Sequence, residues 1–331
     1  MMSDSDPRFS RRFFLVGGAG FIGSHFADRL LGDPGIAAVA VYDNFSSGRD
    51  WHIAHHLGDP RFSVIRGDVK ELARLTAAMT GFEVVIHLAS NPDIARAATE
   101  PEIDFREGTL LTNNVLEAMR RAGVPRILYA SGSGVYGDIG TIEAGENYAP
   151  LQPISTYGAS KLAGEAMISA YAGMFGLTGC AFRFGNVVGP HQTHGVGLDF
   201  LRRLLADGSR LAILGDGAQS KSYIHVNDVI NAVLLAHRTV TEPFKVFNVA
   251  TGDYITVTEI AEIVIDCAGL RRDQVKLAYE GGDRGWKGDV PIVRLDTQRI
   301  RSLGWSCRLS SREAIQLSVS ELRKDIRAGR L

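Results

Sequence analysis

Short runs of apolar residues alternate with longer helical patterns through the first half of the chain. The apolar runs are RFFLVGG (12–18), AAVAVYD (37–43), FSVIRGD (62–68), EVVIHLAS (83–90), RILYASG (126–132) and GCAFRFGNVVG (179–189). The helical patterns occupy residues 21–32, 105–122 and 156–176. Strands that are apolar throughout and alternate with helices belong to parallel sheets covered on both faces. The pattern therefore predicts an α/β fold with a doubly wound parallel sheet.

This rhythm loosens beyond residue 180, where glycine-rich links separate shorter elements. The segment YITVTEIAEIVIDCAGL (254–270) reads as a helix entered through a threonine cap. We predict a loose tail over residues 1–11, a first domain over 12–180 and a smaller mixed α/β substrate-binding lobe over 181–331. Segments near 222–248 are expected to return to the first sheet.

Composition indicates an ordinary soluble globular protein. Of 331 residues, 45% are hydrophobic and 22% charged, and the formal net charge is −1, so no overall field favours nucleic acid or an anionic membrane. The polar start MMSDSDPRFSRR lacks the apolar core of a signal peptide. No apolar run approaches the roughly 18 residues of a membrane helix. Three cysteines without a close pair suit a reducing compartment, so we expect the cytoplasm.

Histidines cluster in WHIAHH (51–56) and HQTH (191–194). A metal site needs convergent ligands, and neither segment contains a carboxylate or thiolate in a matching motif. The sequence therefore predicts surface or loop histidines and no metal. The basic run RRDQVK (271–276) has no interleaved aromatic residues, which indicates a solvated loop rather than a nucleic-acid site.

A glycine pattern follows the first predicted strand. LVGGAGFIGSH can be read as Gly18-x-Gly20-x-x-Gly23 or as Gly17-x-x-Gly20-x-x-Gly23, with a helix after it and Asp43 at the end of the second strand. This is the context of a Rossmann-like dinucleotide site, in which glycines admit a pyrophosphate and the helix N-terminus favours its charge. Asp43 would accept ribose hydroxyls and repel the extra phosphate of NADP, which favours NAD. The alternative is a tight turn with a surface aspartate.

The segment TYGASK places Tyr157 and Lys161 four residues apart, on one face of a helix. The pKa of a free tyrosine is about 10, so ionisation at neutral pH needs nearby positive charge, which an ammonium and an oxidised nicotinamide can supply. Tyr157 could then take a proton from a sugar hydroxyl as hydride leaves the carbon. Such pairs also occur by chance, and the glycine pattern upstream is what makes this one informative.

Eight motifs occur in the order GGAGFIG, YDNFSSG, GDV, HLAS, SGSGVYG, YGASK, RFGNVVGP and GDGAQSKSYIHVND. In this order they resemble the extended short-chain dehydrogenase/reductases that act on nucleotide sugars. Within that family the chain is similar to UDP-glucose 4-epimerases, including the later GDRGWKGDV. The resemblance covers roughly residues 12–325.

The resemblance implies a tightly held NAD, a transient 4-keto sugar, Tyr157 as acid/base and Lys161 as its partner. It also implies that residues 181–331 bind a nucleotide-diphosphate sugar, most simply a UDP-hexose, through Asn186, Lys221 and Arg284. Lys221 stands where the family more often has arginine, so it keeps the charge without the bidentate fork. The implied cofactor residues are Gly17, Gly20, Phe21, Ile22, Gly23, Asp43, Asn44, Asp68, Val69, Leu88, Ala89, Ser90, Tyr157, Lys161 and Phe184.

A glycine stands where the family carries a helper hydroxyl, at Gly132 in YASGSGVYGD. We expect Ser133 to replace that hydroxyl, with Ser131 as second choice and a bound water as third. Both serines could instead only bond locally to the backbone.

The same tract bears on the reaction. Family dehydratases carry an Asp-Glu pair, and decarboxylases a glutamate, where this chain has Ser133-Gly134. The resemblance therefore favours 4-epimerisation over dehydration or decarboxylation. Other readings are an epimerase of UDP-glucuronate or a UDP-N-acetylhexosamine, a reductase, and a non-catalytic NAD-binding protein. Small and apolar residues on helices 105–122 and 157–175 are consistent with the homodimer that the resemblance implies. The alternative is that these faces are buried within a single chain.

Overall fold

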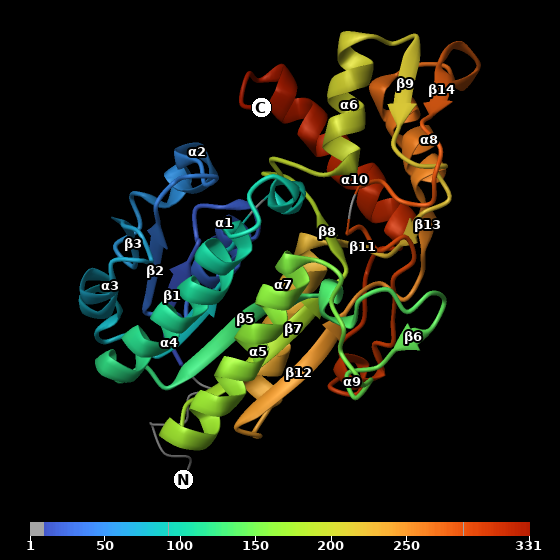
Figure 1. Cartoon of the computed structure of the whole chain (residues 1–331). Helices are drawn as coiled ribbons and strands as arrows, with labels where there is room; N and C mark the ends of the chain where they lie inside the picture. Colours follow the sequence, from blue (N-terminus) through green and yellow to red (C-terminus); the bar gives the residue numbers. More distant parts are fainter. Residues whose placement is uncertain (1–9, 92, 287) are drawn as a thin grey trace. The chain divides into compact units, whose positions relative to one another are not determined.

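The computed structural model describes residues 10–331 except 92 and 287, so the tail predicted for 1–11 lies almost wholly outside it (Figure 1). The described chain divides into two compact units. The first unit comprises the chain up to Gly132, Thr156–Arg183 and Ile230–Phe247. The second comprises Ser133–Ser155, Phe184–Val229 and Asn248–Leu331. The predicted boundaries differ in that residues 133–155 belong to the second unit and the returning segment is 230–247.

The first unit is built on a seven-stranded sheet in the order β12-β7-β5-β4-β1-β2-β3. Pairing from β5 through β4, β1 and β2 to β3 is parallel, as predicted for a Rossmann-like sheet. The strands are β1 (Arg12–Val16), β2 (Ala38–Asp43), β3 (Phe62–Arg66), β4 (Val84–His87), β5 (Arg126–Gly132), β7 (Thr178–Phe184) and β12 (Phe244–Val249). The main helices are α1 (Phe21–Leu31), α3 (Leu72–Met79), α4 (Leu110–Ala122), α5 (Thr156–Phe175) and α7 (Val226–Thr239).

Successive side chains of a strand point to opposite faces of the sheet, and here both faces are covered. Phe14 and Val16 of β1 join a core that also contains Leu116 of α4 and Ile168 of α5, all fully buried. Helix α1 packs against β1 and β2. In Figure 1, α4 and α5 lie side by side along β5. Burial on both faces explains why these strands are apolar throughout rather than alternating.

The helix predicted over 105–122 is not uniform. Phe105–Thr109 form a π-helical turn, and the α-helix α4 begins only at Leu110. Gly108 lies in the π-helical turn, where a Cβ atom would come within 2.7 Å of Ser160 Oγ on α5. The glycine thus permits a close approach of this turn to α5.

The second unit is the predicted mixed α/β lobe. Its short strand pairs are β8 (Asn186–Val188) with β11 (Tyr223–His225), β10 (Ser220–Lys221) with β13 (Ile255–Thr256), β9 (Arg210–Ile213) with β14 (Lys276–Tyr279), and β6 (Glu143–Ala144) with β15 (Arg294–Leu295). Its main helices are α6 (Val196–Ala206), α8 (Val257–Ala268) and α10 (Ser311–Arg327). The predicted threonine cap of α8 is confirmed: Thr256 and Glu259 form a reciprocal capping box. Across the described residues, no helix combines the length and the apolar character needed to cross a membrane.

Candidate active site

The glycine loop between β1 and α1 is shaped for close approach of a ligand to the backbone. Gly17 has φ +80°, and a Cβ there would lie 2.8 Å from Ala89 N. A Cβ on Gly23 would overlap the Gly17 carbonyl and lie 2.6 Å from Gly18 Cα. No side chain caps the N-terminus of α1 at Gly20, which leaves its first amide groups for an anion. These features fit the pyrophosphate of NAD.

Asp43 is fixed at the end of β2 by backbone amides. Ala19 N donates to its Oδ2 at 2.9 Å, and Phe45 N donates to its Oδ1 at 2.8 Å. Burial raises the pKa of Asp43, and these two amide hydrogen bonds oppose that shift. The carboxylate is thus tied directly to the glycine loop, which suits a group that binds the adenosine ribose.

Asn44 and Asp68 meet beside it. Asn44 Nδ2 lies 3.4 Å from Asp68 Oδ2, and Asp68 Oδ1 accepts a hydrogen bond from Lys70 N at 2.9 Å. Val69 differs from its neighbours, because its side chain is 7% exposed and packs in the core. Phe21 is partly buried and packs edge-on against His25, with ring centroids 5.9 Å apart.

Residues after β4 lie directly beside the glycine loop. Leu88 N and Ala89 N both donate to the Val16 carbonyl, at 2.9 and 3.1 Å. Ser90 makes a side-chain hydrogen bond with Tyr157, which lowers the pKa of that phenol. The structure therefore links the predicted cofactor residues of the HLAS motif to the predicted acid/base.

Tyr157 and Lys161 lie one turn apart near the start of α5, as predicted. Lys161 is 4% exposed, and its Nζ lies 5.3 Å from the centre of the Tyr157 ring. The same Nζ donates to the Ala130 carbonyl at 2.8 Å. Burial lowers the pKa of Lys161 to about 8 and raises the pKa of Tyr157 to about 12. In the chain alone, burial thus outweighs the attraction expected from the lysine, and further positive charge is needed to prime the phenol.

Asp104 is the acidic group that acts on both members of the pair. It is 1% exposed and accepts hydrogen bonds from Thr156 Oγ1 at 2.6 Å and Asn91 Nδ2 at 2.8 Å. Burial is the largest influence on the pKa of Lys161, which it lowers, and the charge of Asp104 raises that pKa. The pKa of Tyr157 is raised by burial, lowered by the hydrogen bond with Ser90 and raised, to a smaller extent, by Asp104. No motif points to Asp104 in the sequence.

His87, Thr112 and Tyr129 form a buried polar cluster beside Lys161. His87 Nε2 lies 3.1 Å from Thr112 Oγ1, and Lys161 Nζ lies 5.4 Å from the centre of the Tyr129 ring. Burial, then Lys161, lowers the pKa of His87 to about 3, so this imidazole is neutral. His87 and Tyr129 are register partners on β4 and β5. Their shared position near the carboxyl ends of adjacent parallel strands is the signal that could have found them.

The two candidate serines have different environments. Ser131 is buried and donates to Glu165 at 2.6 Å, and Arg183 Nη2 contacts the same carboxylate at 2.7 Å. A hydroxyl whose proton is committed to a buried carboxylate is a poor helper for a sugar. Ser133 opens a short 3-10 turn and is partly exposed. A Cβ on Gly132 would meet no atom within 4 Å, so the missing side chain leaves open space.

Within the second unit, the structure brings two of the three predicted diphosphate residues together. Lys221 Nζ lies 2.5 Å from Asp289 Oδ1, and Arg284 Nη1 donates to the Asp289 carbonyl at 2.7 Å. Arg284 also pairs with Asp138 at 2.6 Å. Asn186 Nδ2 donates to the Ser222 carbonyl at 3.2 Å. Asp289 therefore orients both cations, a role the sequence did not indicate.

Phe184, predicted to lie near the nicotinamide, is the last residue of β7 and is 7% exposed. Its ring is therefore largely covered by protein.

Comparisons with known proteins agree with this geometry. The model of the NAD dependent epimerase/dehydratase family matches residues 13–250. The UDP-glucose 4-epimerase of Mycolicibacterium smegmatis is 32% identical over 320 residues, covering 94% of this chain and 98% of that protein. A UDP-galactose 4-epimerase of known structure is 37% identical, with a TM-score of 0.84 over 95% of this chain and 99% of that one.

A related reaction occurs among the similar structures. The dTDP-glucose 4,6-dehydratase of Streptomyces venezuelae, solved with NAD bound, is 28% identical, with a TM-score of 0.86 over 95% of this chain and 97% of that one. Similarity in fold therefore covers more than one reaction on a nucleotide sugar.

Proposed function

Because the chain belongs to the NAD-dependent epimerase/dehydratase family, we propose that it is a nucleotide-sugar 4-epimerase of the UDP-glucose/UDP-galactose type. NAD, when bound, would supply the hydride acceptor and donor for carbon 4 of the sugar. Gly17, Gly20 and Gly23 would admit its pyrophosphate, and Asp43 would hold its adenosine ribose. Leu88, Ala89 and Ser90 would lie along it.

Tyr157 moves the proton in this proposal. As the hydride leaves carbon 4, the phenolate of Tyr157 takes the proton of the 4-hydroxyl group, and a 4-keto sugar results. The sugar turns over, hydride returns to its other face, and the Tyr157 hydroxyl returns the proton to the 4-oxygen. Protons and electrons balance without a net oxidant. Lys161 would hold the nicotinamide ribose and supply positive charge beside the phenol.

The residues that follow β5 favour epimerisation over dehydration. Loss of water from the sugar needs an acid and a base near carbons 5 and 6, and Ser133-Gly134 offers no carboxylate there. Within the first unit, Glu165 accepts the hydrogen bond of Ser131, is 4% exposed and is paired with Arg183. A simple 4-epimerase needs neither extra group.

The substrate side of the proposal rests on Asn186, Lys221 and Arg284, which would bind the diphosphate. Asp289 orients both cations, and each is balanced by a carboxylate, Lys221 by Asp289 and Arg284 by Asp138, so a diphosphate would take the place of these carboxylates as their anionic partner. The sugar could also be a uronate or an N-acetylhexosamine, which the same chemistry would serve. The free cysteines Cys180, Cys267 and Cys307 support a reducing compartment such as the cytoplasm.

A direct test is to incubate the purified protein with a panel of nucleotide sugars without added cofactor and to identify products by NMR. We expect UDP-glucose and UDP-galactose to interconvert with no net change in NADH. A 4-keto-6-deoxy product would identify a dehydratase, and a stoichiometric need for NADH a reductase. Tyr157→Phe should lower turnover by about 10² to 10⁴-fold, and unchanged turnover would remove the acid/base assignment.

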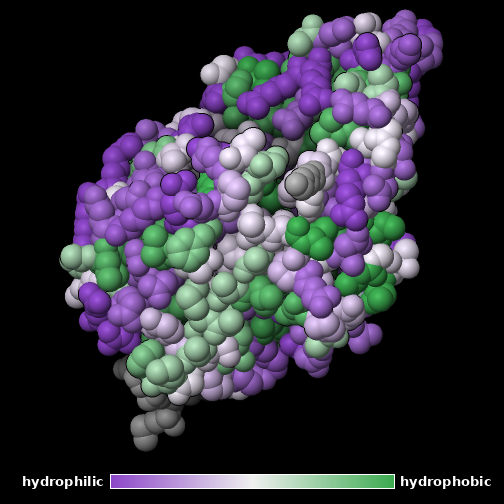
Figure 2. Space-filling model, in the orientation of Figure 1, coloured by the Kyte–Doolittle hydropathy of each residue, from purple (hydrophilic) through white to green (hydrophobic). Residues whose placement is uncertain are grey.

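The proposed assembly is a homodimer formed through α4 and α5. Ala166 and Ala170 on α5 are exposed, and Ala163 and Met167 are only partly buried, so packing within the chain leaves this face uncovered. Figure 2 shows weakly hydrophobic residues gathered over α5. Light scattering at micromolar concentration tests the proposal, and a monomeric mass would reject it.

A further inference from the structure

Two neighbouring histidines and an aspartate converge on one side of the first unit. His55 and His56 lie in the short 3-10 helix η2 (Ala54–His56), and Asp28 lies on α1. Asp28 Oδ1 is 2.8 Å from His55 Nε2 and 2.6 Å from His56 Nε2. Sequence patterns did not reveal this cluster, because Asp28 precedes the histidines by 27 and 28 residues.

A third imidazole borders the same carboxylate. His25 Nδ1 lies 3.6 Å from Asp28 Oδ2, one turn earlier on α1, and the His25 side chain is 11% exposed. The side chain of His56 is 15% exposed and that of His55 53% exposed. The cluster is therefore partly covered and open to solvent on the side of His55.

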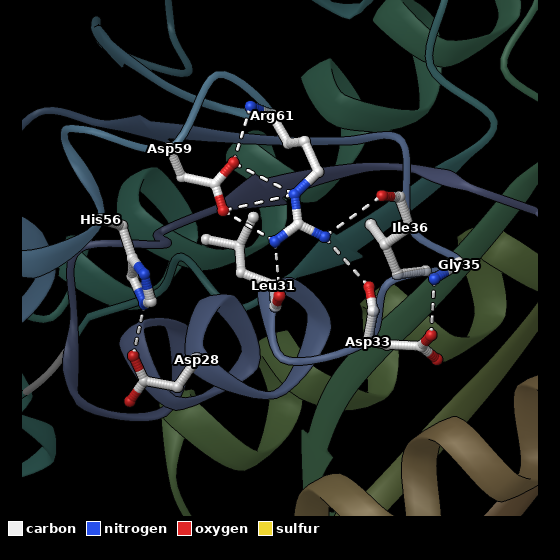
Figure 3. Close-up of polar contacts among 8 residues, drawn as sticks. All are labelled: Asp28, Leu31, Asp33, Gly35, Ile36, His56, Asp59 and Arg61. Atoms are coloured by element: carbon white, nitrogen blue, oxygen red, sulfur yellow. Dashed lines mark hydrogen bonds and ion pairs between the residues drawn. The ribbon is translucent and has the colours of Figure 1, made fainter.

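Arg61 forms hydrogen bonds with residues that follow Asp28 and with a residue that follows His56 (Figure 3). Its guanidinium donates to the carbonyl of Leu31 at 2.6 Å, just after Asp28, and to that of Asp33 at 3.1 Å. It also pairs with Asp59 at 2.7 Å, just after His56. The loop carrying His55 and His56 is thus held against the end of α1, which fixes the approach of the imidazoles to Asp28.

We propose that Asp28, His55 and His56 form a binding site for a divalent metal ion such as Zn²⁺, with solvent completing its coordination. Two imidazole nitrogens and one carboxylate oxygen are a donor set that suits Zn²⁺, Cu²⁺ or Ni²⁺, whereas Mg²⁺ and Ca²⁺ prefer oxygen alone. The three ligand atoms lie within 4.8 Å of one another.

Little movement separates the observed cluster from a metal complex. Metal–ligand bonds of about 2.0 to 2.2 Å place tetrahedral ligand atoms about 3.3 Å apart. The two nitrogen–oxygen distances here are 2.6 and 2.8 Å, so the side chains need to separate by roughly half an ångström. An ion would replace the shared imidazole protons and join η2 to α1 through the metal.

Calorimetric titration of Zn²⁺ into untagged, EDTA-treated protein tests the proposal. We expect one ion per chain and a higher thermal midpoint with Zn²⁺, because binding to the folded state stabilises it. Asp28→Asn should weaken binding at least about tenfold, and His55→Ala with His56→Ala should remove it. The matched control is Asp50→Asn: the side chain of Asp50 is 74% exposed and pairs with Arg66, outside the cluster. It should bind Zn²⁺ as the unmodified protein does.

The unmodified protein provides a measurement that depends on no variant. With one equivalent of Cu²⁺, its electron paramagnetic resonance spectrum should show hyperfine coupling to at least two imidazole nitrogens. Absence of Zn²⁺ binding, binding unchanged in both ligand variants, or a Cu²⁺ spectrum without imidazole nitrogen would each overturn the proposal. None of these measurements uses the enzymatic reaction, so they test the metal site independently of the proposed epimerase activity.

Discussion

At the scale of single residues, the reactive pair lies where burial opposes the charged form of both side chains. Lys161, with a pKa near 8, remains mostly protonated at neutral pH, whereas Tyr157, with a pKa near 12, remains a phenol. The ammonium of Lys161 is therefore buried beside a neutral phenol, without a negative charge on Tyr157 to balance it. This arrangement makes the protonation of the pair sensitive to any further charge placed nearby.

Asp104 offers a way to test that sensitivity. Its negative charge raises the pKa of Tyr157, so Asp104→Asn should lower that pKa. The acid limb of the pH profile of kcat should then move to lower pH, because the phenolate forms more readily. Thr156→Ala is the matched control, since it removes the hydrogen bond to Asp104 and keeps the charge. A profile that moves equally in both variants would mean that Asp104 only positions α5.

Gly132 offers a second residue-scale test. Space beside it is open, so Gly132→Ser should be accommodated without strain and add a hydroxyl where the family carries one. If Ser133 only partly replaces that hydroxyl, kcat should rise by about tenfold. Ser133→Ala should lower kcat, and the double variant should recover it. No recovery in the double variant would argue that position 132 does not reach the sugar.

At the scale of elements, close contact between α5 and β5 depends on one glycine. A Cβ on Gly164 would overlap the hydroxyl of Tyr129, whereas a Cβ on Gly173 of the same helix would meet no atom within 4 Å. Alanine in place of glycine within a helix stabilises by about 1 kcal/mol when space allows. Overpacking of a core costs about 1 to 3 kcal/mol.

The two glycines therefore form a matched pair. Gly173→Ala should raise the free energy of unfolding by up to about 1 kcal/mol, and Gly164→Ala should lower it by roughly 2 kcal/mol. Urea denaturation followed by circular dichroism measures both. Equal effects in the two variants would show that Tyr129 moves aside without cost.

The same elements show what a sequence can predict. Apolar strands were sufficient to predict the parallel sheet, and the spacing in TYGASK was sufficient to place Tyr157 and Lys161 one turn apart on a helix, because these signals are local and periodic. The π-helical turn at Phe105–Thr109 was not predicted, since it depends on how closely Gly108 can approach Ser160 on another helix.

Two other features could not be predicted because they depend on contacts between residues that are distant in the sequence. Ser131 is turned toward Glu165, a residue 34 positions later, and Asp28 meets His56 across 28 positions. Neither pairing leaves a local pattern in the sequence. Side-chain direction at a strand end and convergence of ligands from separate elements are properties of packing, so they become visible only in the folded chain.

At the scale of the whole molecule, buried charge links the active site to global stability. Burial is the main cause that lowers the pKa of Lys161 from 10.5 to about 8 in the folded chain. Between those two pH values the unfolded chain still binds the lysine proton that the folded chain has released. Unfolding therefore takes up a proton, and this group makes the free energy of unfolding rise as pH rises from 8 to 10.5.

Lys161→Met isolates that contribution. The variant should gain stability relative to the unmodified protein at pH 7, where the buried ammonium is most costly. That advantage should shrink by about 2 kcal/mol between pH 7 and pH 10, as measured by urea denaturation of the cofactor-free proteins. Tyr157 is kept in both proteins, so its opposite effect at higher pH cancels. Lys276→Met, on an exposed position of β14, should follow the unmodified protein at every pH. An advantage of Lys161→Met that stays constant with pH would mean that the lysine is solvated, and priming of Tyr157 by a buried ammonium would lose its basis.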